Sequence, residues 1–581
     1  MGTGAATAGA RLFCACPVTR SARSHGSCRR PIRAGGRRGA AVLDIKNDAF
    51  LIYCNFVYNF WVVYGFAFHD CDSQVKPATS RGFRSWTEGL SLLFNTFAFF
   101  LVFLPITLAA YFLISRKNLR ASIVFLLVAS VVFYSYWDIR YLPLLAASII
   151  CNFSIGRGIV ANIERGQKAT SRRWLVTGLV FNLALLIFYK YANFIVENLA
   201  AATGWPLVSP GIELPIGISF FTFTQIAYLV DCHQGKVRET RPESYGLFVT
   251  YFPHLIAGPI LHHKEMIPQF DAPQTHVFGT GRLTVGMIFF TIGLFKKVVL
   301  ADGVARFVAP VFDLHHADLT QAEAWAGALA YTFQLYFDFS AYSDMAYGLS
   351  YMFGIILPIN FFSPYKATSI IEFWRRWHIT LSTFLRDYLY IPLGGNRKGQ
   401  VQRFTNLLIT MLLGGLWHGA NWTFLVWGGL HGLYLIINHA IRSVLGERGG
   451  IARAATGLVV TWLAVIVAWV VFRANSLEIA LSVLEAMWHG TASPAAQDAW
   501  LGTDRIMPMA ECWLWLAGCA AIVLLLPNAY EALGRGPLPE REARLQGTRG
   551  GLAIGVLLAV SLLLLAVSET RGVSEFLYFN F

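Results

Sequence analysis

Charged side chains are scarce in this sequence: Asp, Glu, Lys and Arg together make up 14% of its 581 residues, against about 25% in soluble domains. Because 55% of the residues are hydrophobic and 15% are aromatic, this scarcity excludes an ordinary soluble enzyme. Lipid solvates such side chains, and Trp and Tyr favour the two membrane interfaces. We therefore predict an all-α polytopic membrane protein.

Familiar catalytic and binding motifs are also missing. No nucleophile elbow, Walker loop, HExxH pair or dinucleotide fingerprint occurs in a credible context. The nine cysteines show no paired ligand spacing, so we expect no metal site and no disulfide framework. These absences favour general-base transfer without a covalent intermediate on this chain.

Lysine and acidic residues are absent from residues 1–43, which contain eight Arg. This leader carries much of the formal net charge of +14, so the high pI does not indicate nucleic-acid binding. Its composition fits an organellar transit sequence, a disordered leader or an over-extended start. We expect residues 1–90, with one doubtful apolar segment at 49–68, to be dispensable.

From Ser91 onward, long apolar runs alternate with short basic loops. The early runs lie near 94–115, 121–137, 141–156 and 174–201, and later ones near 457–473, 512–527 and 552–568. The positive-inside rule places the early basic loops in the cytoplasm and Ser91 outside. Their basic residues are Arg116, Lys117, Arg120, Arg157, Arg165, Lys168, Arg172, Arg173, Lys236, Arg238 and Arg241.

Proline and glycine interrupt the apolar sequence between residues 213 and 440. The interruptions include Pro215, Gly217, Pro253, Gly258, Pro259, Pro358 and Pro364. Backbone groups freed by such breaks must be packed in protein or line a cavity, because lipid cannot satisfy them. This stretch therefore predicts a compact core around a transmembrane tunnel or pocket.

The segment 373–399 mixes charged and aromatic side chains, which favours an amphipathic helix at a membrane face. On a continuous helix, His378 would share a face with Trp374 and Ser382. His378 is then a candidate functional residue, and the alternative is a histidine that only forms hydrogen bonds in the core.

His418 is the second candidate, because an imidazole among apolar residues is held neutral and can act as a base. The flanking Gly414, Gly415 and Gly419 would let substrate or backbone approach it. His431 would point to nearly the opposite side unless Gly419 breaks the helix, so we expect it to be structural. A purely structural role for His418 is the alternative.

These segments resemble the membrane-bound O-acyltransferase family, in particular its alginate O-acetyltransferase subunit I branch. The WRRWH and GLWHG elements carry this resemblance together, and it covers residues 91–581. Other matching stretches are SLLFNTFAFFLVFLP at 91–105, ASVVFYSYWDIRYLPLL at 129–145, LPIGISFFTFTQIAYLVD at 214–231, YFPHLIAGPI at 251–260 and FLYFNF at 576–581.

The resemblance implies a helical ring around a tunnel, in which His418 is the catalytic histidine and His378 the second polar core position. It implies an acyl donor that arrives from the cytoplasm and an acceptor that arrives from the other side. Members of this branch look as if they begin near Leu92 or Leu93, which favours an over-extended start as the origin of residues 1–90.

We accordingly expect an O-acetyltransferase of the bacterial inner membrane that uses acetyl-CoA or another acyl thioester as co-substrate and has no tightly bound cofactor. The expected acceptor is an exported polysaccharide such as alginate, reached through a periplasmic acetyltransferase partner. Arg397 and Lys398 follow a Gly-rich turn and are candidate contacts for an anionic donor, unless the loop only sets topology. Acyl transfer such as D-alanylation of another envelope polymer, or a lipid or polysaccharide conduit, are the alternatives.

Overall fold

The computed structural model describes residues 92–580, except 238–240, 316, 447–449, 490–505, 534–541, 544 and 546. The described residues belong to the second of two compact units, Phe83–Phe581. The segment 1–90, expected to be dispensable, lies outside the described residues.

Every regular element in the described part of the chain is a helix. Eight of the described helical stretches are long and apolar enough to cross a membrane. This confirms the predicted all-α polytopic membrane fold. The early stretches are Ala98–Ser115, Leu119–Trp137, Ile139–Glu164 and Lys168–Thr203, and the later ones are Thr280–Leu314, Trp422–Val444, Ile451–Arg473 and Thr548–Arg571.

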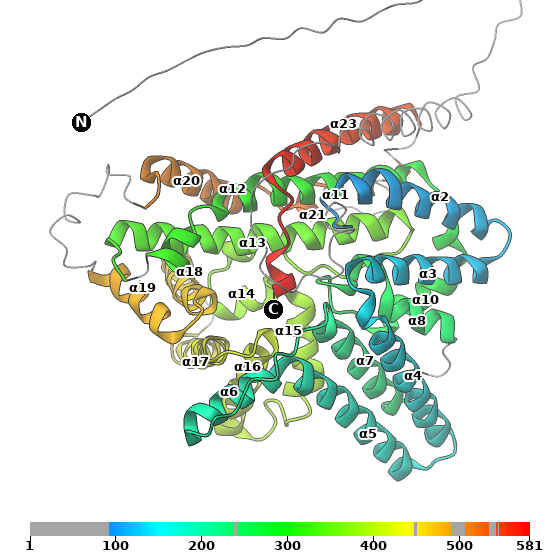
Figure 1. The fold of residues 1–581 in the computed structure, drawn as a ribbon, viewed down its shortest axis with the longest axis horizontal. Helices are drawn as coiled ribbons and strands as arrows, with labels where there is room; N and C mark the ends of the chain where they lie inside the picture. Colours follow the sequence, from blue (N-terminus) through cyan, green and yellow to red (C-terminus); the bar gives the residue numbers. More distant parts are fainter. Residues whose placement is uncertain are drawn as a thin grey trace, which may run out of the picture. The chain divides into compact units, whose positions relative to one another are not determined.

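The helices are labelled in the order in which they occur along the chain (Figure 1). The first group is α2 (Leu104–Ser115), α3 (Leu119–Trp137), α4 (Leu142–Glu164), α5 (Lys168–Leu186), α6 (Ala192–Thr203), α7 (Ile218–His233), α8 (Pro242–Thr250), α9 (Phe252–Leu255) and α10 (His263–Asp271). The second is α11 (Thr280–Phe295), α12 (Asp302–Ala305), α13 (Gln321–Met352), α14 (Ile370–Arg376), α15 (Ile379–Leu385), α16 (Gly399–His418), α17 (Trp422–Leu445), α18 (Ile451–Arg473), α19 (Leu477–His489), α20 (Met509–Leu525), α21 (Ala529–Ala532) and α23 (Thr548–Arg571).

Helix α13 is the most deeply buried long helix of the described fold. It begins with a capping box in which Thr320 and Glu323 satisfy each other's backbone N–H groups. Only Gln321, Trp325, Leu329 and Gln334 of its 32 residues are partly exposed. A helix that is buried on all sides lies inside the protein core, which agrees with the predicted compact middle of the chain.

Small residues bring α11 and α13 into close contact. A Cβ atom on Gly286 would lie 2.6 Å from the backbone oxygen of Gly348, so neither position accepts a side chain. Next to this contact, a π-helical segment, Lys296–Ala301, presents two lysines to buried carboxylates of α13. Lys296 Nζ lies 2.6 Å from Asp344 Oδ2, and Lys297 Nζ lies 2.9 Å from Asp338 Oδ1.

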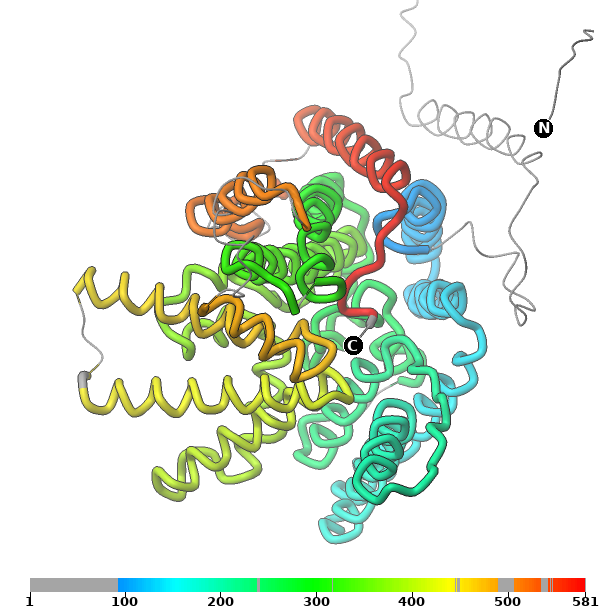
Figure 2. Tube along the Cα trace, turned by 60° about the vertical axis from the view of Figure 1, so that its left-hand side comes forward, coloured from blue at the N-terminus to red at the C-terminus, as the bar shows by residue number. Residues whose placement is uncertain are grey.

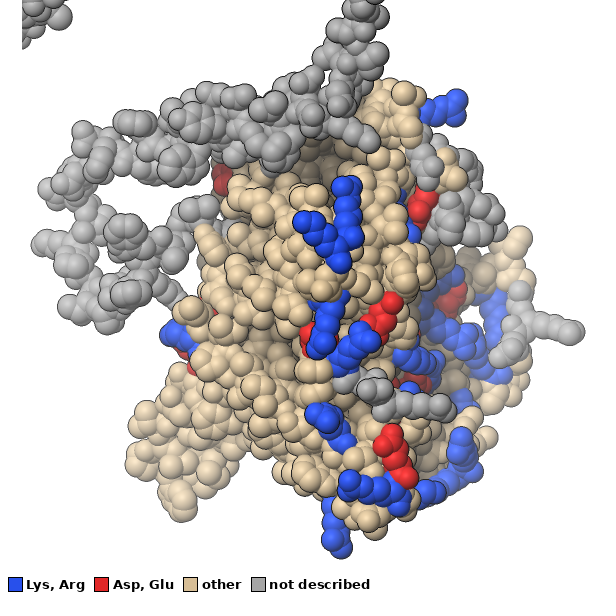
Figure 3. Space-filling model, turned by 90° about the vertical axis from the view of Figure 1, so that its right-hand side faces the viewer, with Lys and Arg blue, Asp and Glu red and all other residues tan. Residues whose placement is uncertain are grey.

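The early basic connections lie at one end of the helices. Arg120, in the first turn of α3, pairs with Glu243 of α8 at 2.6 Å, and Ser171 of α5 contacts His233 of α7 at 2.8 Å. Lys and Arg side chains are prominent on the face that lies to the right in Figure 1 (Figure 3). That this end faces the cytoplasm stays a prediction from the positive-inside rule.

The C-terminal segment that follows α23 returns into the middle of the fold (Figure 2). The backbone oxygen of Glu575 accepts a hydrogen bond from Lys297 at 2.8 Å. The backbone N–H of Leu577 donates to Asp338 Oδ2 at 2.9 Å. The buried ion pair therefore anchors the end of the chain beside α13.

Candidate active site

His418 is the last residue of α16, and the chain turns sharply after it. Gly419 is extended at φ −169°, and Asn421 caps the start of α17 by accepting a hydrogen bond from the Thr423 N–H at 3.1 Å. A Cβ atom on Gly415 would lie 2.2 Å from the backbone oxygen of Phe424. The glycines beside His418 therefore let the backbone of α17 approach α16.

The imidazole of His418 is 5% exposed and is surrounded by aromatic rings. Its ring centroid lies 5.0 Å from that of Trp417, 5.1 Å from Trp427 and 5.2 Å from Phe472. Its Nδ1 lies 3.1 Å from the hydroxyl of Tyr578. Among the described residues, Nε2 of His418 makes no hydrogen bond, so this nitrogen is left for a reactant.

His378 does not lie on the continuous helix that the sequence predicts. Helix α14 ends at Arg376, and His378 has a left-handed backbone at φ 43° before α15 begins at Ile379. The predicted face shared with Trp374 and Ser382 is therefore wrong, because the helical periodicity is broken at this point. A left-handed histidine costs conformational energy, and such strain is concentrated at functional sites.

The break in the helix brings His378 toward His418. Their ring centroids lie 6.5 Å apart, and the ring of Tyr578 lies 5.9 Å from that of His378. His378 Nδ1 lies 3.1 Å from Asn360 Oδ1, which only accepts hydrogen bonds. Nδ1 therefore carries the proton, and Nε2 is a buried acceptor with no hydrogen-bond partner among the described residues.

His431 lies closer to His418 than the sequence predicts. The helix does break at Gly419, so the calculated opposite-side position does not apply. The ring of Trp427 lies between the two histidines, 5.1 Å from His418 and 4.9 Å from His431. His431 Nδ1 accepts a hydrogen bond from the indole N–H of Trp374 at 3.2 Å. These contacts suit the structural role expected of His431.

Lys190 is a buried lysine near His418, and the sequence analysis did not single it out. It lies in a π-helical turn, Ile187–Tyr191, and its Nζ donates to Ser219 Oγ at 3.1 Å and to the backbone oxygen of Trp417 at 2.5 Å. Tyr191 donates to the backbone oxygen of Leu416 at 2.6 Å. Both side chains satisfy carbonyl groups that the end of α16 leaves free. The available signal was a lysine inside a membrane-length apolar run.

Arg397 and Lys398 are exposed and precede the first residue of α16. His418 lies at the other end of this 20-residue helix, which corresponds to about 28 Å at 1.5 Å per residue. The structure therefore does not bring these two candidate donor contacts together with the histidines.

Among the described residues, no group of three or more His, Cys, Asp or Glu side chains could hold a metal ion.

Two cavities are each lined by a residue that contacts His418. One of about 130 Å³ is lined by Tyr578, Ser219 and Phe220, among others. The other, of about 500 Å³, is lined by Phe472, Arg473 and further polar residues such as Asn421. Whether these cavities join into the expected tunnel stays a prediction.

Residues 131–481 match the model of the membrane-bound O-acyltransferase family, and this range contains both His378 and His418. The chain belongs to that family. It is 43% identical over 423 residues to a peptidoglycan O-acetyltransferase of Helicobacter pylori. This match covers 68% of this chain and 80% of that protein. It is 46% identical over 402 residues to a probable alginate O-acetylase AlgI of Azotobacter vinelandii, covering 68% of this chain and 78% of that protein.

A more distant relative is a teichoic acid D-alanyltransferase of Streptococcus thermophilus, which is 27% identical over 266 residues, 44% of this chain and 64% of that protein. The family and these relatives identify the protein as a membrane O-acyltransferase. Of the alternatives left open by the sequence, a non-enzymatic conduit is thereby set aside. Tyr578, which contacts His418, lies outside the residues matched by the family model.

Proposed function

We propose that this acyltransferase moves an acetyl group from a cytoplasmic thioester, such as acetyl-CoA, toward hydroxyl groups of a cell-envelope polysaccharide in the bacterial inner membrane. The relatives that match this chain over most of their own length are a peptidoglycan O-acetyltransferase and a probable alginate O-acetylase. Their names support alginate or peptidoglycan as the class of final acceptor. A periplasmic acetyltransferase partner that completes the transfer is part of the proposal.

The observation that supports this chemistry best is the pair of buried histidines with one free ring nitrogen each. In the base form of His418, Nδ1–H donates to the Tyr578 oxygen, and Nε2 accepts the proton of the acceptor hydroxyl. The hydroxyl oxygen attacks the thioester carbonyl carbon, and the carbon–sulfur bond breaks. The imidazolium then returns the proton to the departing thiolate, so that an ester and a thiol are the products.

His378 has a different part in this proposal. Its Nδ1 is held by Asn360, which also accepts a hydrogen bond from Thr380 Oγ1 at 2.9 Å. The ring is therefore fixed, and its Nε2 is a preorganised acceptor for a donor group of the reactants. We assign His378 the role of orienting a reactant and His418 the role of general base.

The positions of the cavities and basic loops support the proposed side of entry for each substrate. Arg397 and Lys398 lie at the start of α16, at the end of the helix remote from His418. A thioester donor with phosphate groups would be attracted there by charge. The cavities near Tyr578 and Phe472 lie beside His418 and offer the route for the acceptor.

A transfer assay with the purified full-length protein in nanodiscs tests the donor class. It uses acetyl-CoA labelled in the acetyl group, a D-alanyl thioester as the competing donor, and released thiol as the readout. We expect acetyl-CoA or another acetyl thioester to be consumed in the presence of the acceptor system. Consumption of the D-alanyl thioester alone would instead support the alternative suggested by the D-alanyltransferase relative.

A further inference from the structure

A lateral cavity of about 440 Å³ lies between α17, α18 and the start of α14, away from the two histidines. Its apolar walls include Ile437 and Ile441 of α17 and Val460 of α18. The side chains of Ile437 and Ile441 are each 46% exposed and that of Val460 is 60% exposed. Since α17 and α18 both contain candidate membrane spans, the cavity opens toward the hydrocarbon region of the bilayer.

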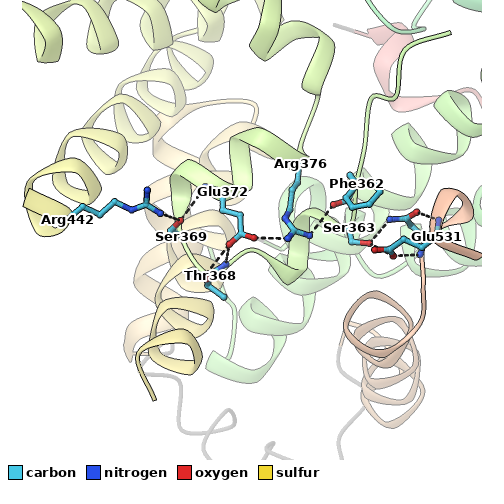
Figure 4. Close-up of polar contacts among 9 residues, drawn as sticks. Phe362, Ser363, Thr368, Ser369, Glu372, Arg376, Arg442 and Glu531 are labelled. Atoms are coloured by element: carbon cyan, nitrogen blue, oxygen red, sulfur yellow. Dashed lines mark hydrogen bonds and ion pairs between the residues drawn. The ribbon is translucent and has the colours of Figure 1, made fainter. Parts of the chain in front are cut away.

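The cavity ends at two arginines. Arg442 lies in the last turn of α17 and Arg453 near the start of α18, and both line the cavity. Arg442 points toward Ser369 at the start of α14, with Nη2 3.5 Å from Ser369 Oγ (Figure 4). Arg453 Nη2 donates to the backbone oxygen of Gly446 at 2.9 Å. None of the described residues that line the cavity is acidic.

The arginines lie at the end of the helices where the chain is basic. Arg403, in the first turns of α16, contacts His439 of α17 at 2.7 Å. The α17–α18 connection is therefore at the same end as Arg397 and Lys398, which the positive-inside rule assigns to the cytoplasm. A ligand held by Arg442 and Arg453 would lie in the inner leaflet.

The floor of the cavity is fixed by neighbouring contacts. A Cβ atom on Gly457 would lie 2.4 Å from the backbone oxygen of Thr368, so α18 is packed tightly against the start of α14. Glu372 of α14 accepts hydrogen bonds from Thr368 N and Oγ1 and pairs with Arg376 at 2.7 Å (Figure 4). Glu372 is thus paired within α14.

We propose that this cavity binds an anionic phospholipid, whose phosphate lies between Arg442 and Arg453 and whose acyl chains run along α17 and α18. Basic pockets between membrane helices on the cytoplasmic side are suited to anionic headgroups. The exposed apolar walls distinguish a lipid from a soluble phosphate, which would gain nothing from them. The buried Oδ1 of Asn438, which lacks a hydrogen-bond partner among the described residues, is available to a headgroup hydroxyl.

A lipid in this cavity would also contact the aromatic cluster behind the active site. Tyr434 lines the cavity, and its ring centroid lies 5.7 Å from that of His431. His431 contacts Trp427, which in turn contacts His418. The lipid site is nevertheless separate from the reacting groups, so its test does not depend on the proposed donor or acceptor.

Native mass spectrometry of the full-length protein with dioleoyl phosphatidylglycerol or dioleoyl phosphatidylcholine tests the proposal. The wild type should retain phosphatidylglycerol in preference to phosphatidylcholine. The double variant Arg442→Gln/Arg453→Gln should bind phosphatidylglycerol about 30-fold more weakly, because each basic residue near an anionic headgroup contributes a factor of about five. The charge-matched control Arg165→Gln/Arg173→Gln, with one exposed arginine in the α4–α5 connection and one in the first turns of α5, should bind as the wild type does.

A second variant, Val460→Trp, fills the apolar part of the cavity and keeps both arginines. It should also lose the retained phosphatidylglycerol, whereas soluble glycerol phosphate should not compete with the lipid in the wild type. Equal binding by the wild type and the arginine double variant would overturn the proposal. So would an equal loss in the control, unchanged binding by Val460→Trp, or full competition by glycerol phosphate.

Discussion

The hydroxyl of Tyr578 lies 3.1 Å from Nδ1 of His418, although 160 residues separate the two in the sequence. The contact exists because the C-terminal segment is held beside α13 by Lys297 and Asp338. The ring of Tyr578 stacks on that of Phe339, with centroids 4.0 Å apart. The last residues of the chain therefore complete the surroundings of the proposed base.

Tyr578→Phe removes the hydroxyl and keeps the stacked ring. We expect turnover to fall about tenfold, because Nδ1 of His418 loses the hydrogen bond that fixes its tautomer. The kcat for thiol release is the measurement, with Tyr136→Phe as the control at an exposed position. Unchanged kcat in Tyr578→Phe would show that His418 does not need this partner.

Lys190→Met tests whether the buried lysine positions the end of α16. The substitution leaves the backbone oxygen of Trp417 without its donor, which costs about 1–3 kcal/mol in free energy of unfolding. It should also lower kcat, because His418 is the next residue along the chain. Lys168→Met, an exposed change at the start of α5, serves as the matched control. A wild-type kcat and stability in Lys190→Met would contradict the positioning role.

The buried pair of Lys297 and Asp338 predicts strong coupling between two substitutions. Lys297→Met should destabilise the protein by about 3–5 kcal/mol, because it leaves the Asp338 carboxylate buried without its cation. Adding Asp338→Asn should recover part of that loss. Denaturation in detergent of the two single variants and the double variant measures the coupling. Strictly additive losses would show that the pair does not act as a unit.

The sequence predicts the class of fold well because it depends on composition and on the lengths of apolar runs. The membrane spans and the compact middle of the chain appear where these signals place them. His418 could be found because an imidazole stands out in apolar sequence beside a glycine-rich motif. Its aromatic surroundings were partly visible too, since Trp417 is its neighbour in the chain.

The errors in the candidate site have local and long-range causes. The left-handed backbone at His378 ends the helical periodicity, and no turn residue in the sequence marks that position. The break at Gly419 likewise changes the position of His431 relative to His418, so that both rings contact Trp427. Tyr578 was missed as a site residue because its position depends on backbone hydrogen bonds to Lys297 and Asp338, which are far away in the chain. Lys190 was visible as a lysine inside an apolar run, but its partners, Ser219 and the backbone oxygen of Trp417, come from α7 and α16 and are known only from the fold.

Arg397→Glu/Lys398→Glu tests the proposed contact with an anionic donor. The reversed charges should raise the apparent KM for acetyl-CoA and leave kcat nearly unchanged, because the pair lies far along α16 from His418. Arg165→Glu/Lys168→Glu reverses two charges at another exposed basic connection and is the control. If both double variants change KM equally, the loop contributes only general surface charge.

The central claim is that His418 is the general base, and turnover of His418→Gln in the full-length protein tests it most directly. Glutamine keeps much of the volume of the side chain but cannot take up the proton, and positioned proton transfer contributes about 10²–10⁴ in rate. We predict a loss of thiol release by at least 10²-fold with unchanged membrane insertion, while His439→Gln on α17 keeps its activity. Wild-type turnover by His418→Gln would contradict the account and make His418 a structural residue.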